Sequence, residues 1–146
     1  MSKKKINIAV IGATGYTGLD LVLLLSKHPK ANIISLCATK NLGKKISFFD
    51  KRIKKKLPRI SSVNKIIWSK IDIAFLSLPN GEAHKLVKKI YFQNKNVKFI
   101  DLSADFRITN SKEYKKNYNK EHGAVNLIKD SIYSISEFVK NDINKY

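Results

Sequence analysis

Cysteine, tryptophan and proline are scarce in this chain of 146 residues, which has one Cys, one Trp and three Pro. A single cysteine excludes a disulfide within the chain. No apolar run approaches the roughly 20 residues that a membrane-spanning helix requires. The basic N-terminus, Met1–Lys5, is followed by a strand-like segment and lacks a signal-peptide cleavage region. From these absences we expect a cytoplasmic protein that does not insert into membranes.

Acidic residues are also few, at 11 against 29 Lys and Arg, so the formal net charge is +18. Such an excess is typical of proteins that neutralise nucleic-acid phosphates. Here, however, nearly all of the positive charge is lysine, spread from Lys3 to Lys145 among many Ile and Asn residues, as A/T-rich codons would produce. We therefore favour a solvated lysine coat and expect no specific nucleic-acid partner. The charge would still attract anionic small molecules.

The rest of the chain is organised around a strand, a glycine turn and a helix between Ile6 and Leu25. Free N–H groups and the dipole at such a helix N-terminus favour a phosphate, and glycines let the backbone approach it. The candidate cofactor-binding residues of this turn are Gly12, Ala13, Thr14, Gly15, Tyr16, Thr17 and Gly18. The alternative is a plain strand–helix turn that binds nothing. Pro29 should end the helix at about His28.

Three further apolar runs predict strands at Asn32–Ala38, Ile71–Leu78 and Asn96–Leu102, and Ala83–Ile90 has helical spacing. Strands that alternate with helices predict an α/β fold, a Rossmann-type doubly wound parallel sheet, with Ile6–Ile11 central and next to Asn32–Ala38. We expect one NAD(P)-binding domain over residues 1–146.

Some smaller predictions follow from the same patterns. His84 should face solvent with the neighbouring lysines, and Cys37 should be a buried, inert thiol. The segment up to about Lys129 is polar and lysine-rich, Ser131–Ile135 is predicted as a short strand, and a last helical piece is predicted from Ser136.

Ligands of parallel α/β sheets bind at the carboxyl ends of the strands. The candidates there, besides the glycine turn, are Thr39, Lys40, Lys44, Ser77, Leu78, Pro79, Asn80 and Ser103. No carboxylate for a ribose hydroxyl follows the second strand before Asp50, whereas Thr39 and Lys40 suit a 2′-phosphate. The sequence therefore favours NADP(H) over NAD, although these lysines could simply belong to the coat. The basic stretch 44–59 could bind single-stranded nucleic acid, but we favour a loop held by its apolar residues.

Several segments resemble those of N-acetyl-gamma-glutamyl-phosphate reductases. Gly12–Gly18 is similar to the glycine loop of that family, and Leu76–Gly81 is similar to its later cofactor turn. Ile100–Arg107, with the sequence Ile-Asp-Leu-Ser-Ala-Asp-Phe-Arg, is the most specific match. With Tyr133–Phe138 the resemblance covers essentially all 146 residues. That last segment departs from the family pattern, because Ser134 and Ser136 stand where the family usually has Gly and Pro.

The resemblance implies an enzyme of arginine biosynthesis in which NADPH reduces N-acetylglutamyl phosphate to the semialdehyde through a cysteine thioester, with a histidine as acid/base. The chain ends at Tyr146, before the family's Asn-Pro-Gly-Cys segment, and neither Cys37 nor His122 matches a catalytic position. We therefore assign no catalytic residue and no metal ligand, and expect the chain alone to be inactive. The full-length family enzyme is expected to be a homo-oligomer.

The resemblance also bears on the substrate. Ser103 and Arg107 are the candidate substrate-binding residues, since a guanidinium suits the oxygens of an acyl phosphate. A structural ion pair of Arg107 with Asp105 or another carboxylate is the alternative role for that arginine. Two other functions stay open at this point. The chain could be the cofactor domain of a related semialdehyde dehydrogenase, or a non-catalytic nucleotide-binding remnant.

Overall fold

The computed structural model describes residues 4–135, and these residues fall into two compact units. The first unit contains the chain up to Leu78 together with Gln93–Leu102. The second contains Pro79–Phe92 and the chain from Ser103 onward. The sheet lies in the first unit, so the two units are described in turn.

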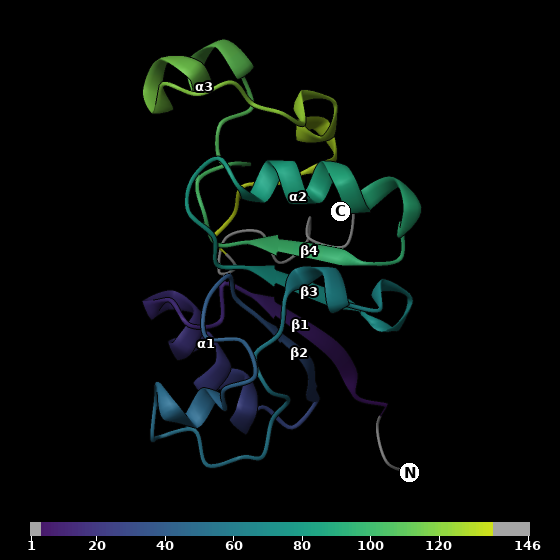
Figure 1. The fold of residues 1–146 in the computed structure, drawn as a ribbon. Helices are drawn as coiled ribbons and strands as arrows, with labels where there is room; N and C mark the ends of the chain where they lie inside the picture. Colours follow the sequence, from purple (N-terminus) through teal and green to yellow (C-terminus); the bar gives the residue numbers. More distant parts are fainter. Residues whose placement is uncertain (1–3, 136–146) are drawn as a thin grey trace. The chain divides into compact units, whose positions relative to one another are not determined.

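The first unit is built on a sheet of four parallel strands in the order β2-β1-β3-β4 (Figure 1). The strands are β1 (Ile6–Ile11), β2 (Ala31–Cys37), β3 (Ile73–Leu76) and β4 (Lys98–Asp101). The predicted parallel α/β sheet is thus confirmed, with β1 inside the sheet and paired with β2. The last two strands are shorter than the apolar runs that predicted them.

The helices are α1 (Tyr16–Lys27), α2 (Ala83–Ile90) and α3 (Ser111–Tyr118), with short 3₁₀ helices η1 (Ile46–Phe48), η2 (Val63–Lys65), η3 (Trp68–Lys70), η4 (Tyr91–Gln93) and η5 (Val125–Asp130). The predictions for α1 and α2 are confirmed. The prediction that residues 131–135 form a strand was wrong, since that segment has no regular structure. The predicted helical piece from Ser136 lies outside the described residues.

A bulge in β2 keeps its large side chains on the face that the core requires. Ile8 lies opposite Ile33, but Ala9 lies opposite Ser35, so β2 carries one extra residue at Ile34. The extra residue reverses the alternation of the strand, which returns Leu36 to the face that Ile33 occupies. This face belongs to a buried cluster that also takes in residues of α1 and of the 44–60 segment: Ile8, Val10, Val22, Ile33, Leu36, Ile46, Ile53 and Ile60.

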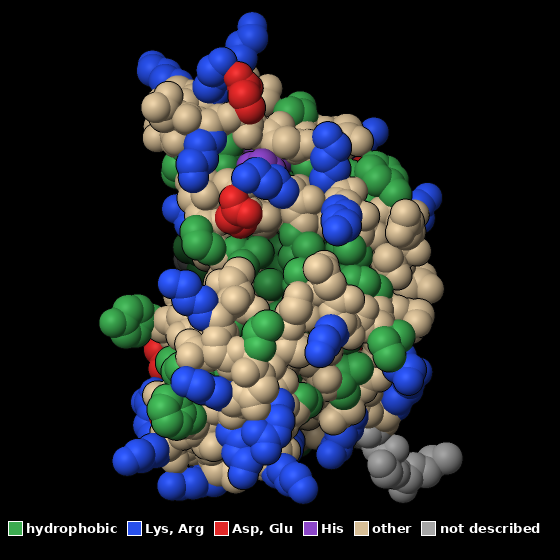
Figure 2. Space-filling model, viewed as in Figure 1, with side chains coloured by type: hydrophobic (Ala, Val, Ile, Leu, Met, Phe, Trp, Pro, Cys, Tyr) green, Lys and Arg blue, Asp and Glu red, His purple; other side chains and the backbone are tan. Residues whose placement is uncertain are grey.

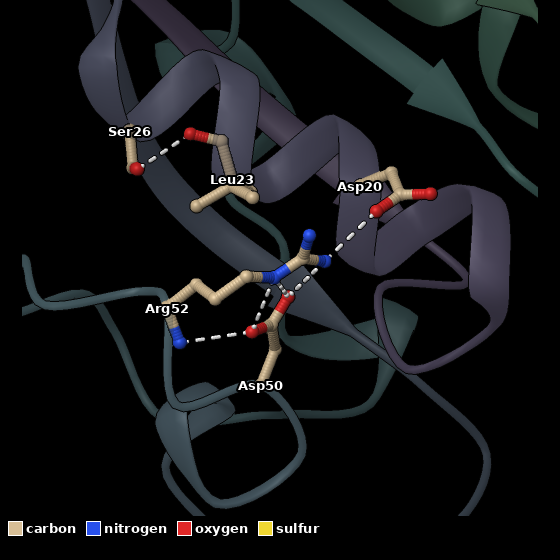
Figure 3. Close-up of polar contacts among 5 residues, drawn as sticks. All are labelled: Asp20, Leu23, Ser26, Asp50 and Arg52. Carbon is tan, nitrogen blue, oxygen red and sulfur yellow. Dashed lines mark hydrogen bonds and ion pairs between the residues drawn. The ribbon is translucent and has the colours of Figure 1, made fainter.

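The basic stretch 44–59 is an irregular loop whose apolar residues are buried, as favoured from its composition. Ile46 and Ile53 are 2% and 1% exposed. Arg52 connects the loop to α1, because its guanidinium lies 3.1 Å from the Asp20 carboxylate and 2.8 Å from that of Asp50 (Figure 3). Hydrogen bonds from Arg52 lower the pKa of Asp50 below its ordinary value. Charge in this loop therefore supports the fold.

On the face drawn in Figure 2, basic side chains are distributed rather than gathered into one stripe. Figure 2 shows Lys and Arg scattered over the visible face with few Asp or Glu among them. This distribution is what a lysine coat predicts. Within the described residues, no helix is long and apolar enough to cross a membrane.

Helix α1 packs against the end of β1 at Gly18. A Cβ at this buried position would lie 2.1 Å from the Gly12 carbonyl oxygen, far inside van der Waals contact. At Gly15, in contrast, a Cβ would lie 3.5 Å from the same oxygen, which is an ordinary contact. The two glycines of one turn therefore face different constraints.

Replacing Gly18 with Ala should lower the free energy of unfolding by about 3 kcal/mol, the upper end for overpacking, because backbone rather than a flexible side chain must move. Gly15→Ala is the matched control and should change stability by less than about 1 kcal/mol. Urea unfolding of both variants, followed by circular dichroism, tests the difference. Equal stability of the two variants would show that the close approach at Gly18 does not constrain the fold.

Candidate functional site

The glycine turn is fixed by contacts with the ends of two strands. Gly12 has φ +85°, and a Cβ there would lie 1.9 Å from the Ser77 carbonyl oxygen, so the turn touches the residue that follows β3. The amides of Gly12 and Ala13 both donate to the Cys37 carbonyl, at 2.9 and 3.0 Å. The turn therefore lies at the carboxyl edge of β1, β2 and β3, where the sequence predicted it.

The same hydrogen bonds decide which amides of the turn are free for a ligand. The N–H groups of Gly12 and Ala13 donate to a carbonyl of the protein itself. In contrast, the N–H groups of Thr14, Tyr16 and Thr17 have no acceptor within residues 4–135. Helix α1 also begins without a side-chain cap and without an acidic residue in its first turn. An uncapped, unshielded N-terminus of this kind suits a phosphate group.

The predicted 2′-phosphate residues follow β2 in a well-fixed loop. Thr39, Lys40 and Lys44 are all exposed. The loop is hydrogen-bonded to the segment around Ile60. The Gly43 amide donates to the Ile60 carbonyl at 2.7 Å, and the Ile60 amide donates to the backbone carbonyl of Lys44 at 3.0 Å. The ammonium of Lys44 lies 5.0 Å from the centre of the Phe48 ring, so this charge has an aromatic neighbour. Lys40 makes no ion pair with any described residue.

Cys37, at the end of β2, is buried, as predicted. Its Sγ lies 3.9 Å from the Ser61 hydroxyl. Burial raises the pKa of the thiol above its ordinary value, and the hydrogen bond to Ser61 only partly opposes this shift. A thiolate, the nucleophilic form, is therefore disfavoured at this position.

In the second unit, the side chain of Asp105 is fully buried and accepts several hydrogen bonds at once. The amides of Gly81 and His84 donate to its carboxylate at 2.7 and 3.1 Å, and the Tyr114 hydroxyl lies 2.9 Å away. Glu82, the residue before α2, gives no side-chain cap. Asp105 therefore caps α2 from a distant part of the chain, and its negative charge complements the helix dipole.

Asp105 is thus engaged away from Arg107, and no ion pair joins the two among the described residues. The guanidinium of Arg107, an exposed residue, lies 5.4 Å from the centre of the Tyr133 ring. Ser103, on the other side of Asp105, accepts a hydrogen bond from the Asp105 amide at 3.2 Å. The alternative role predicted for Arg107, a structural pair with Asp105, is therefore not seen.

The prediction that His84 faces solvent was wrong, since this side chain is only 2% exposed. Its ring lies 4.7 Å from that of His122, and its Nδ1 accepts from the Gly123 amide at 3.2 Å. A Cβ at Gly123 would lie 2.9 Å from the same nitrogen. The spacing of His84 from Val87, three residues along α2, was the available signal for the buried face. The three lysines beside His84 hid that signal.

The cofactor and substrate candidates are thus distributed over the two units. The turn from Gly12 to Gly18, Thr39–Lys44 and Ser77–Leu78 belong to the first unit, while Pro79, Asn80, Ser103 and Arg107 belong to the second. Sequence reasoning missed the buried Asp105 cap and Tyr114. A carboxylate between Ser103 and Phe106, in a chain poor in acids, was the only hint of the cap.

The described surface also has an open hollow of about 630 Å³ in the first unit, away from these residues. Asn7, Asn32 and Asp72 line it, and they lie at the amino ends of β1, β2 and β3. The glycine turn lies at the opposite edge. Because parallel α/β sheets bind ligands at their carboxyl edge, the hollow is not the candidate site.

Comparison with known proteins identifies the family. The family model described as "Semialdehyde dehydrogenase, NAD binding domain" matches residues 7–146. This chain belongs to that family. The match explains why the glycine turn, the parallel strand order and the free helix N-terminus occur together.

Individual relatives of this NAD-binding domain are more specific. The chain is 42% identical over 143 residues to the N-acetyl-gamma-glutamyl-phosphate reductase of Ehrlichia ruminantium (strain Gardel), covering 97% of this chain and 40% of the relative. It is 36% identical over 144 residues to a probable chloroplastic N-acetyl-gamma-glutamyl-phosphate reductase of Arabidopsis thaliana, covering 98% and 35%. The chain therefore spans about two fifths of the length of such relatives.

Solved structures of semialdehyde dehydrogenases share the fold. Aspartate semialdehyde dehydrogenase II from Vibrio cholerae matches with a TM-score of 0.56 and 26% identity, over 71% of this chain and 30% of the other. The aspartate semialdehyde dehydrogenase of Candida albicans, solved with NADP, matches with a TM-score of 0.55 and 23% identity over 71% and 31%. The Rossmann-type fold of the NAD-binding domain is thereby confirmed.

The buried His122 should make this NAD-binding domain acid-sensitive. Burial, and then the neighbouring His84, lower the pKa of His122 below its ordinary value of 6.5, although Asp105 acts in the opposite direction. Below about pH 6.5, His122 binds a proton in the unfolded chain but resists protonation in the folded chain. The free energy of unfolding should therefore decrease as the pH is lowered. His122→Phe, which keeps an aromatic ring, should flatten this dependence between pH 7.5 and 5.

Urea midpoints measured across that pH range provide the test. His28→Gln is the matched control, because it removes an exposed histidine in place of a buried one. A His122→Phe variant that loses stability in acid as steeply as the parent would show that His122 does not cause the sensitivity.

Proposed function

We propose that this chain is the cofactor-binding part of an NADP-dependent reductase that converts N-acetylglutamyl phosphate to N-acetylglutamate semialdehyde in arginine biosynthesis. The observation that carries the proposal is the 42% identity to a named N-acetyl-gamma-glutamyl-phosphate reductase over 97% of the chain. The geometry of the glycine turn supports it. For the full-length enzyme we also propose a cytoplasmic location and a homo-oligomer.

The pyrophosphate of the cofactor would be held at the N-terminus of α1. Thr14, Tyr16 and Thr17 offer the backbone donors, while Gly12 and Gly18 leave room for the close approach of β1 and α1. Gly15 and Ala13 complete the turn. A side chain on Gly12 or Gly18 would meet backbone and push the turn out of shape.

The remaining cofactor contacts would come from the segments after β2 and β3. Thr39, Lys40 and Lys44 are the proposed partners of the 2′-phosphate, because a hydroxyl and two ammonium groups suit its charge. Ser77, Leu78, Pro79 and Asn80 follow β3 in the chain and are proposed to contact the cofactor beyond the pyrophosphate. NADPH would supply the hydride.

Ser103 and Arg107 are the proposed substrate contacts. The exposed guanidinium of Arg107 forms no ion pair with a described residue, so its charge is available for an acyl phosphate. The tyrosine ring beside it limits where the guanidinium can lie. The second candidate function is the cofactor domain of a different semialdehyde dehydrogenase, which the structural match to the Vibrio cholerae enzyme favours.

NADP should bind the chain at least about tenfold more tightly than NAD, because the exposed ammonium of Lys40 would meet the additional phosphate. Lys40→Ala should remove most of this preference by weakening NADP binding and leaving NAD binding unchanged. Titration of both cofactors, followed by calorimetry, measures the effect. Lys54→Ala, at another exposed lysine, is the charge-matched control. Equal affinity of the parent for both cofactors would remove the 2′-phosphate assignment.

The 146-residue chain alone should show no turnover. Its one cysteine is buried, and the pKa of that thiol is raised, so no positioned thiolate can hold the acyl group while hydride arrives. The assay is NADP-dependent oxidation of the semialdehyde in the presence of phosphate, with a full-length relative as positive control. Turnover by the chain that is abolished by Cys37→Ser would overturn this expectation.

A further inference from the structure

The hydroxyl of Tyr114 lies between two oxygen atoms, and one proton cannot serve both. Tyr114 comes from α3, and its side chain is fully buried. Its hydroxyl oxygen is 2.9 Å from Oδ1 of Asp105 and 2.8 Å from Oδ1 of Asn80. A phenol has a single O–H donor, so only one of these contacts can be the hydrogen bond that Tyr114 donates.

The carboxylate of Asp105 is the stronger acceptor for the Tyr114 hydroxyl proton. A hydrogen bond to an ionised acceptor is roughly twice as strong as one to a neutral amide. The phenol oxygen then faces Asn80 as an acceptor, which would place two acceptors 2.8 Å apart if the amide oxygen stayed there. Rotation of the Asn80 amide by 180° removes the conflict, because its NH₂ group then donates to Tyr114.

This rotation of the Asn80 amide breaks no hydrogen bond made by its NH₂ group within the described part of the second unit. The amide nitrogen of Asn80 makes no hydrogen bond with any described residue in its present orientation. The backbone of Asn80 is held independently, since Lys120 donates to its carbonyl oxygen at 2.7 Å. The donors then form a chain from Asn80 to Tyr114 to Asp105, and Asp105 is in turn fixed by the amides of Gly81 and His84.

We propose that Tyr114 and Asp105 are positioning residues that make Asn80 present its amide oxygen, and not its nitrogen, to the cofactor. The inference rests on the proposed function, in which Asn80 contacts NADP(H). An amide oxygen accepts hydrogen bonds, so the group that Asn80 recognises is a donor on the cofactor. The candidates are the carboxamide NH₂ of nicotinamide, the adenine NH₂ and a ribose hydroxyl. A phosphate, which carries only acceptors near neutral pH, is excluded as the partner of this side chain.

The orientation of the amide can be tested without any ligand. In the ¹⁵N-labelled chain, the side-chain NH₂ protons of Asn80 should show nuclear Overhauser contacts to the Tyr114 ring protons and slowed exchange with water. Tyr114→Phe should remove the slowed exchange. Tyr118→Phe is the matched control, because Tyr118 lies on the same helix with its ring 5.0 Å from that of Tyr114. A freely exchanging Asn80 amide in the parent would overturn the inference, and this measurement does not require that any variant folds.

Three ligands identify the donor: NADP, its 3-acetylpyridine analogue, which lacks the carboxamide NH₂, and 2′-phospho-ADP-ribose, which lacks nicotinamide. If the carboxamide is the donor, the parent should bind NADP about fivefold more tightly than the analogue, a typical value for one hydrogen bond. Asn80→Ala and Tyr114→Phe should both abolish that ratio and leave 2′-phospho-ADP-ribose binding unchanged. If a ribose hydroxyl or the adenine NH₂ is the donor, Asn80→Ala should weaken all three ligands equally.

A merely structural role for Tyr114 would make Tyr114→Phe weaken all three ligands while Asn80→Ala weakened none of them, which would contradict the inference. Loss of the nuclear Overhauser contacts between the Asn80 NH₂ protons and the Tyr114 ring on saturation with NADP would also contradict it. If the parent binds none of the three ligands, the proposed function fails and the assignment of a cofactor donor fails with it. The amide orientation measured in the free chain would still decide whether the Asn80–Tyr114–Asp105 chain exists.

Discussion

The first unit depends on the close approach of three backbone segments at Gly12. The φ of +85° turns the chain away from β1, and the absence of a side chain lets the Ser77 carbonyl come within contact distance. The Cys37 carbonyl then collects the amides of Gly12 and Ala13. The ends of β1, β2 and β3 are thereby joined, and α1 is aimed with its first N–H groups free. The binding potential of the turn is a consequence of this packing.

Asp105 holds several segments of the second unit together, as Gly12 does in the first unit. It does so through hydrogen bonds to a charged group and not through close backbone packing. A buried carboxylate is unfavourable unless it is well hydrogen-bonded, and this one receives two backbone amides of the segment that opens α2. It accepts the Tyr114 hydroxyl as well, which links α3 to the same centre. The acid that stands between Ser103 and Arg107 is therefore used internally, and it forms no ion pair with Arg107.

The parts of the fold that local pattern controls could be predicted from the sequence. Apolar runs with β-branched residues placed the strands, and the glycine spacing placed α1 and its turn. Helix α3 was missed because its segment is dominated by Lys, Asn and Tyr, although Asn110 caps it by accepting from the amides of Lys112 and Glu113. The burial of His84 had only a weak local signal, its spacing from Val87, because the Gly123 amide that donates to His84 lies 39 residues away. Local composition hid α3, whereas a contact between distant residues decided the error at His84.

The candidate site shows the same division between local and distant causes. Residues proposed to act through their backbone, such as Thr14 and Thr17, were predicted from the glycine pattern alone. Residues that act through their side chains could be listed but not oriented, because orientation depends on neighbours elsewhere in the chain. Asn80 is the clearest case, since Tyr114 lies 34 residues further along the chain. An amide that presents its oxygen binds a donor of the ligand, whereas one that presents its NH₂ binds an acceptor. A sequence motif that contains Asn80 therefore does not define which kind of group this side chain binds, because Tyr114 and Asp105 set the orientation of the amide.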